Sequence, residues 1–127
     1  DEIAKVMSPG THGTTFGGNP LVTASGCATI DIMKKENLVQ NSHDLGARWM
    51  QDLKSIGSDK IKEVRGYGLI IGIEMDSPET ASSIQKYCRD NGILINVCHG
   101  STIRLIPPLI INDEQKDIFT KVLKECL

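Results

Sequence analysis

A short segment near the start of the chain combines the residue types that bind anions. Residues 10–20 read GTHGTTFGGNP, so that two neighbouring hydroxyl side chains, Thr14 and Thr15, stand among several glycines. Glycines allow bare backbone N–H groups to approach an anion, and threonine hydroxyls add further donors. A phosphate group is bound best by several preorganised donors with no bulky Cβ atom in the way. The residues taken alone are compatible with an anion-binding loop and with an ordinary surface turn.

A single cation in an apolar segment is the second candidate for chemistry. Arg104 lies within residues 102–109, which read TIRLIPPL. A lone buried cation is very costly, so the guanidinium needs a partner or water. It can bind a carboxylate in bidentate fashion, and each charge-assisted hydrogen bond contributes roughly 1.5–3 kcal/mol. We interpret Arg104 as a candidate carboxylate ligand, with an internal salt bridge or an edge-strand arginine facing water as alternatives.

The first helix must begin directly after the glycine-rich loop. Asn19 is a favourable N-cap and Pro20 suits the first helical position. The helix interior, residues 23–28, consists of small residues that include glycine and threonine, which are poor helix formers. This composition indicates close packing against another backbone.

The rest of the chain alternates between helical and strand patterns. The predicted elements are a helix over residues 38–56, strands over 61–65 and 69–75, a helix from 78, strands over 93–97 and 102–106, and a helix capped by Asn112. The apolar stripes predicted for these three helices include Val39, Tyr87 and Ile118. This order favours an α+β fold, a small and mainly antiparallel sheet with helices packed on one face. The first helix fits that layer less well, so we expect a boundary between residues 1–36 and residues 37–127.

Composition excludes several classes of function. A formal charge of −2 leaves no basic footprint for nucleic acid, and an aromatic content of 4% argues against a base-stacking platform. No apolar run approaches the ~20 residues that span a bilayer, and no signal peptide is visible. The four cysteines form no C-x-x-C pair, which favours free thiols in a cytoplasmic protein over disulfides or a metal site. We expect no nucleic-acid, membrane or metal partner.

The loop sequence also resembles a known signature. GTHGTTFGGNP is similar to the signature of class III, pyridoxal-phosphate-dependent aminotransferases, and most similar to the acetylornithine type. VRGYGLIIG at residues 64–72 and IRLIPPL at residues 103–109 resemble two further strings of that family, V-R-G-x-G-L-x-x-G and R-x-x-P-P-L. The strings keep the family's order and spacing, and the resemblance covers essentially the whole chain. It implies the C-terminal domain of a fold-type I transferase.

The resemblance assigns roles to three residues. It implies that Thr15 donates its hydroxyl to the phosphate of pyridoxal 5'-phosphate held by the other subunit of a homodimer, and that Thr14 lies beside the substrate. It implies that Arg104 helps to hold the substrate carboxylate. The glycines between residues 66 and 72 are expected to serve backbone geometry, and Arg65 to be structural.

The resemblance also implies residues that this sequence does not contain. The family's Schiff-base lysine lies upstream of the loop in a Lys-Gly-Leu-Gly-Gly-like segment, and no such segment occurs here. We therefore expect the C-terminal part of a longer enzyme, inactive alone and without covalently bound cofactor. Residues 1–36 would belong to the large domain and the dimer interface, and residues 37–127 would form the small domain.

The parent would transfer an amino group between N-acetylornithine and 2-oxoglutarate in arginine biosynthesis. Its partners would be the upstream large domain, a second subunit and its small-molecule substrates. Two alternatives stay open. One is a related class III enzyme of the ornithine or 4-aminobutyrate type, and the other is a non-catalytic α+β binding or oligomerisation module.

Overall fold

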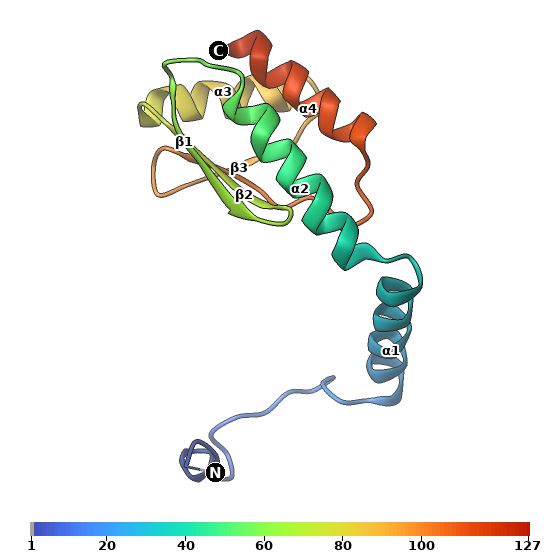
Figure 1. Cartoon of the computed structure of the whole chain (residues 1–127). Coiled ribbons are helices and arrows are strands. Elements are labelled where there is room, and N and C mark those ends of the chain that lie inside the picture. The colour runs from blue at the N-terminus through green and yellow to red at the C-terminus, as the bar shows by residue number, and fades with distance from the viewer. Residues whose placement is uncertain (1) are drawn as a thin grey trace. The chain divides into compact units, whose positions relative to one another are not determined.

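The computed structural model describes residues 2–127 and divides the chain into two compact units. They are Asp1–Glu36 and Asn37–Leu127 (Figure 1).

The first unit holds a loop and one long helix. A 3-10 turn, η1 (Ala4–Val6), precedes the loop, and α1 spans Pro20–Lys35. Helix α1 begins where the sequence predicts, because the Asn19 side chain accepts a hydrogen bond from the Val22 N–H at 3.1 Å. No side chain of α1 is buried. Within the described residues, α1 is therefore supported by its N-cap and by its own backbone hydrogen bonds.

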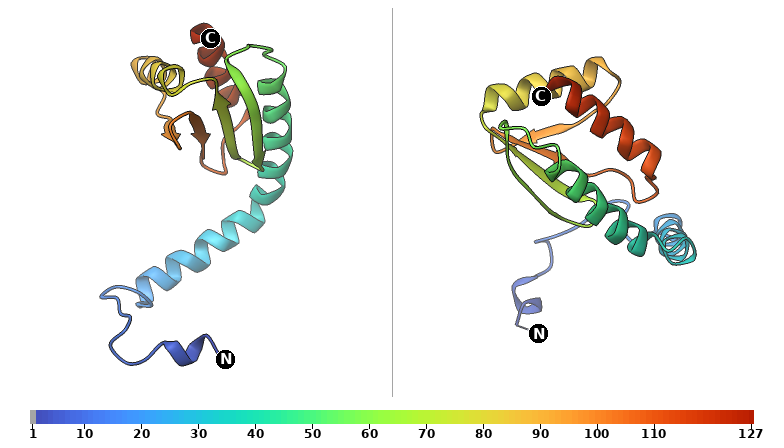
Figure 2. Two further views of the ribbon diagram at one scale, coloured as in Figure 1. Left: turned by 90° about the vertical axis from the view of Figure 1, so that its left-hand side faces the viewer. Right: turned by 45° about the horizontal axis from the view of Figure 1, so that its top comes forward.

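The second unit is built on a four-stranded antiparallel sheet with the order β1-β2-β4-β3. The strands are β1 (Ile61–Tyr67), β2 (Ile70–Met75), β3 (Asn96–Cys98) and β4 (Thr102–Leu105). Three helices lie on one side of this sheet (Figure 1 and Figure 2): α2 (Leu38–Lys54), α3 (Pro78–Asp90) and α4 (Asp113–Cys126). The predicted α+β fold is confirmed.

The core lies between the sheet and these helices. Alternation along the strands turns every second side chain toward the helices, and Ile71, Ile73 and Ile103 there are fully buried. Trp49 of α2 and Phe119 of α4 meet edge to face, with ring centroids 5.7 Å apart. Burying one such side chain contributes about 1.5–3 kcal/mol, which makes this layer the main source of stability.

Polar groups join and cap the helices of the second unit. Ser77 caps α3 by accepting from the Thr80 N–H at 3.1 Å, and Asn112 forms a capping box with Gln115 at the start of α4. The ammonium of Lys116 is nearly buried and binds Asp52 of α2 at 2.5 Å. Burial lowers the pKa of Lys116, but hydrogen bonds to Asp52 and Asp117 outweigh it and raise that pKa. The lysine is therefore charged and ties α4 to α2.

Three residues predicted to be buried are not. Val39, Tyr87 and Ile118 are 69%, 37% and 52% exposed. Each directly adjoins a buried residue of its own helix, and neighbours along an α-helix are turned about 100° from each other. The predicted apolar stripes were therefore too wide.

Several strand and helix boundaries also differ from the predicted ones, and β2 begins one residue later, at Ile70, while β4 ends one residue earlier, at Leu105. Strand β1 continues to Tyr67, because Gly68, at φ +54°, makes the turn that starts the return strand. Strand β3 covers Asn96–Cys98, whereas the prediction was residues 93–97. The backbone just before β3 forms hydrogen bonds with helix α3 instead. The Ile93 N–H donates to the Cys88 carbonyl at 2.8 Å, and the Gln85 side chain donates to the Ile95 carbonyl at 3.1 Å. Helix α2 ends at Lys54, two residues before the predicted end.

Candidate functional site

Of the two neighbouring hydroxyls of the glycine-rich loop, those of Thr14 and Thr15, one is exposed without a partner in residues 2–127. Thr14 Oγ1 accepts a hydrogen bond from the Gly17 N–H at 3.1 Å. A Cβ atom on Gly17 would lie 2.3 Å from Thr14 Cγ2, so a side chain at position 17 would force the Thr14 side chain to shift. Thr15 is exposed, and its hydroxyl makes no hydrogen bond within residues 2–127. The hydroxyl of Thr15 can therefore donate to a ligand.

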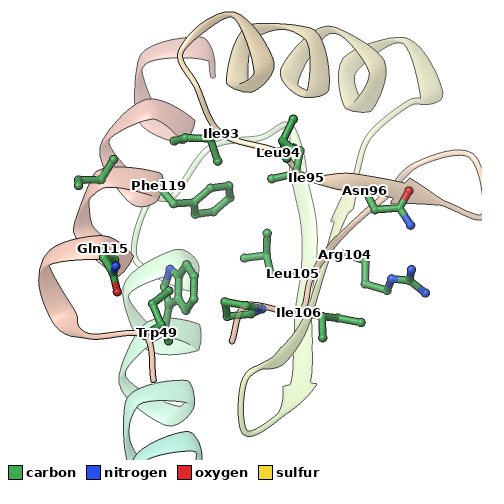
Figure 3. Close-up of a pocket in the computed structure, with 13 residues that line it drawn as sticks. Trp49, Ile93, Leu94, Ile95, Asn96, Arg104, Leu105, Ile106, Gln115 and Phe119 are labelled. Atoms are coloured by element: carbon green, nitrogen blue, oxygen red, sulfur yellow. The ribbon is translucent and has the colours of Figure 1, made fainter. Parts of the chain in front are cut away.

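The other candidate residue lies in the second unit, on the side of the sheet away from the helices. We call that side the open face. Ile103 and Leu105 of β4 are buried against the helices, whereas Arg104 between them is exposed. Figure 3 shows Arg104 and Asn96 pointing the same way, away from Leu105. The alternation of β4 thus places the guanidinium of Arg104 on the open face.

Arg104 faces solvent, as the second alternative expects, but it does so from a central strand and without a salt bridge in residues 2–127. Strand β4 lies between β2 and β3, so Arg104 is not an edge-strand residue. The salt bridges found among residues 2–127 do not include it. Its neighbours in the ladder are Gly72 and Asn96, which carry no charge. The structure leaves all five N–H donors of this side chain available to a ligand.

The second arginine of the open face is already neutralised. Arg65 donates to Glu63 at 2.9 Å and to Glu74 at 3.0 Å. Glu74 also accepts from Ser101 and Thr102, each at 2.5 Å. These hydrogen bonds, that of Ser101 first, lower the pKa of Glu74 to about 2. Glu74 therefore stays ionised and ties three strands together.

Sequence reasoning did not single out Glu74. It stands between Ile73 and Met75 in β2, where alternation alone marks a residue of the opposite face. Its partners lie 9 to 28 residues away, and only the strand register brings them to it. A carboxylate alternating with buried aliphatic residues was the one signal available.

An apolar cavity of about 560 Å³ opens beside Arg104 (Figure 3). Trp49, Phe119 and several aliphatic residues line it, and its polar lining residues are Asn96, Arg104 and Gln115. This lining holds no histidine, carboxylate or lysine. The cavity can therefore receive an apolar group, but it offers no acid–base pair.

The potential metal ligands and the thiols of residues 2–127 form no assembled site. No group of three or more His, Cys, Asp or Glu side chains within residues 2–127 is placed to hold a metal ion. The four cysteines are free, and burial raises the pKa of Cys88 to about 11, which keeps it a neutral thiol.

None of the helices in residues 2–127 combines the length and apolarity that crossing a bilayer requires.

The candidate residues thus fall into two groups. Thr14 and Thr15 are neighbours in the loop of the first unit, and Arg104 lies in the second. Lys5, the only lysine that precedes α1 in the sequence, forms a salt bridge with Glu2 at 2.5 Å. The loop therefore offers hydroxyl and backbone donors for a phosphate, and the sheet offers a guanidinium for a carboxylate.

Known proteins match the chain along its whole length. The family model "Aminotransferase class-III" matches residues 1–127. Ornithine aminotransferase 1 of Staphylococcus saprophyticus is 43% identical over 129 residues, which cover 99% of this chain and 32% of that protein. Acetylornithine aminotransferase 1 of Bordetella parapertussis is also 43% identical, over 94% of this chain and 30% of that protein.

A solved structure agrees in fold. The ornithine aminotransferase of Toxoplasma gondii, with pyridoxal phosphate partly occupying its active site, superposes with a TM-score of 0.84 at 35% identity, over 99% of this chain and 30% of that one. The chain spans about a third of the length of the relatives it matches.

Class III aminotransferases use pyridoxal phosphate. The relatives bear both substrate names at equal identity, so the acetylornithine type is not singled out. What the match along all 127 residues does establish is that this chain belongs to the class III aminotransferases.

Proposed function

We propose that this chain is the C-terminal part of a cytoplasmic, homodimeric, pyridoxal-phosphate-dependent aminotransferase that acts on an ornithine-type amine and 2-oxoglutarate. The observation that carries the proposal is Arg104, an exposed guanidinium on a central strand without a salt bridge in residues 2–127. Both substrates carry a carboxylate, and a planar guanidinium binds that group in bidentate fashion.

The first unit would serve the cofactor rather than the substrate carboxylate. Thr15, whose hydroxyl has no partner within residues 2–127, would donate to the phosphate of the cofactor held by the other subunit. Thr14 would lie beside the substrate. When bound, the cofactor supplies the electron sink that amino transfer needs. The upstream large domain would supply the lysine that binds it.

Two amines are candidates for the donor. N-acetylornithine, a donor in arginine biosynthesis, fits the resemblance of the loop, and ornithine is the second candidate because relatives of both names are equally identical to the chain. Rates of the full-length protein with N-acetylornithine, ornithine and 4-aminobutyrate discriminate between them. A clear preference for 4-aminobutyrate would contradict both.

Substitution of Arg104 in the full-length protein tests whether its guanidinium binds the substrate carboxylate. We expect Arg104→Gln to raise the KM for 2-oxoglutarate about 10- to 100-fold, the loss of one charge-assisted hydrogen bond or more. Arg104→Lys keeps the charge but loses the bidentate geometry, so it should recover part of that loss. An unchanged KM in Arg104→Gln would remove Arg104 from the substrate site.

The isolated chain provides the complementary test. We expect it to show no transaminase activity with pyridoxal phosphate and substrates, and no visible absorbance shift of a stoichiometric lysine Schiff base. Turnover by the isolated chain would overturn the proposal that it needs an upstream domain.

A further inference from the structure

One glycine of the open face stands between the two arginines. The strand register aligns Arg65, Gly72, Arg104 and Asn96 in a single row across β1, β2, β4 and β3. Neighbouring strands lie about 4.8 Å apart, which places the Cα atoms of Arg65 and Arg104 about 10 Å from each other. Gly72 adds no side chain to this row, and the nearest side-chain atoms around it belong to Thr102 and Arg65.

Two other glycines of the same hairpin are required by the chain itself. A Cβ atom on Gly66 would lie 2.3 Å from the carbonyl oxygen of Ile70. Gly68 has a φ of +54°, and a Cβ atom there would lie 2.6 Å from Ser42 Oγ. These two glycines serve backbone geometry, as the sequence predicts.

Gly72 differs from them. A Cβ atom there would lie 3.4 Å from Thr102 Cγ2, 3.8 Å from Arg65 Cγ and 3.9 Å from Arg65 Nε, which are ordinary or nearly ordinary contacts, and its φ lies outside the left-handed region. A glycine inside a strand nevertheless costs stability, because it packs no side chain and loses more backbone freedom on folding. The expectation that all these glycines serve backbone geometry is therefore wrong for Gly72.

The charges on either side of Gly72 indicate what the space receives. Arg65 already binds Glu63 and Glu74, so its charge is compensated. Arg104 makes no salt bridge in the described part of the chain, and the Asn96 amide beside it makes no hydrogen bond there. An anion that reaches the sheet at Gly72 therefore meets unused donors on the side of Arg104 and Asn96.

We propose that Gly72 is a specificity-determining residue, whose missing side chain admits the substrate carboxylate to Arg104. The proposal rests on the function proposed above. The carboxylate lies over the backbone of β2, with Arg104 as its ligand and Asn96 as a neighbouring donor. A methyl group at position 72 would occupy part of that space at ordinary or nearly ordinary contact distances from Thr102 and Arg65.

The experiment uses Gly72→Ala and Gly72→Val in the full-length protein. We expect the KM for 2-oxoglutarate to rise about tenfold in Gly72→Ala and more in Gly72→Val, as the larger side chain weakens the bonds to Arg104. The half-reaction with butylamine, an amine without a carboxylate, should be unchanged. Equal losses with both substrates would overturn the proposal, since they indicate that position 72 packs against protein.

Unfolding of the 127-residue chain separates the site from the fold. We expect Gly72→Ala to leave the thermal midpoint unchanged or to raise it. Ile73→Val, on the helix-covered face of the same strand, is the matched control and should lower the midpoint while leaving the KM unchanged. A clear fall of the midpoint in Gly72→Ala would show that the fold needs this glycine and would overturn the proposal.

The variants at positions 72 and 104 also separate this proposal from the one on which it rests. If Arg104→Gln leaves the KM unchanged, the carboxylate role of Arg104 fails and the role of Gly72 fails with it. If Arg104→Gln raises the KM and Gly72→Val does not, only the role of Gly72 is overturned.

Discussion

The two units of the chain differ in what holds them together. None of residues 2–36 is buried, and leucine and isoleucine side chains of α1 are among the exposed ones. The second unit encloses a cluster of 16 buried hydrophobic residues between its sheet and its helices. An isolated helix of the length of α1, 16 residues, is marginal in water. The first unit thus depends on local hydrogen bonds, and the second on packing.

This difference agrees with the roles proposed for the two regions. Glycines and threonines suit a loop that approaches a phosphate, but they bury little apolar surface. The second unit has its own core and presents Arg104 from a strand that the core holds in place. We expect the first unit to gain its rigidity from protein outside this chain.

The largest predicted effect contrasts the two units directly. Leu53 is 0% exposed in α2, and Leu21 is 79% exposed in α1. We expect Leu53→Ala to lower the free energy of unfolding by about 2–5 kcal/mol, and Leu21→Ala by less than about 0.5 kcal/mol. Urea unfolding of the chain, followed by the fluorescence of its single tryptophan, measures both. Similar losses would show that the first unit shares the core.

The second prediction tests the loop. In the full-length protein, Thr15→Ala should weaken the retention of pyridoxal phosphate by about 1.5–3 kcal/mol, the value of one charge-assisted hydrogen bond. Thr11→Ala is the matched control, because Thr11 Oγ1 donates within the loop to the Ser8 carbonyl at 2.6 Å. Equilibrium dissociation of the cofactor measures the difference. Equal affinities in the two variants would remove Thr15 from the phosphate site.

The third prediction compares the two asparagine caps. Asn112 caps α4 and Asn19 caps α1. We expect Asn112→Ala to lower the free energy of unfolding by about 1 kcal/mol, since α4 belongs to the core. Asn19→Ala should leave the unfolding transition in place and only increase amide exchange in the first turn of α1. A shift of the main transition by Asn19→Ala would contradict the separation of the two units.

The smallest predicted effect concerns the contribution of Glu74 to the stability of the fold at acidic pH. Its pKa falls from 4.5 to about 2 in the folded chain, so the unfolded chain binds more protons in that pH range. The stabilisation by ionised Glu74 is thus fully present above pH 4.5 and is lost as the pH falls toward 2. Glu74→Gln should be less stable than the parent chain at pH 7, with the difference vanishing near pH 2. A difference independent of pH would exclude this carboxylate as its source.

Much of the fold followed from local signals. Asn19, Ser77 and Asn112 each cap a helix as predicted, because a short polar side chain before a helical run satisfies an otherwise unpaired N–H group. The predicted stripes failed at Val39, Tyr87 and Ile118, where a hydrophobic residue lies beside the buried stripe rather than within it. The roles of Thr14, Thr15 and Arg104 stay predictions until the variants are measured.

The sequence by itself determined the family, the helix starts and the alternation that turns Arg104 away from its apolar neighbours, since these depend on short spacings along the chain. Tertiary structure alone decided that Glu74 neutralises Arg65 and that Gly72 separates Arg65 from Arg104. These relations join strands up to 39 residues apart, from Arg65 to Arg104. Their register is set by the packing of one sheet face against the helices, which no local pattern records.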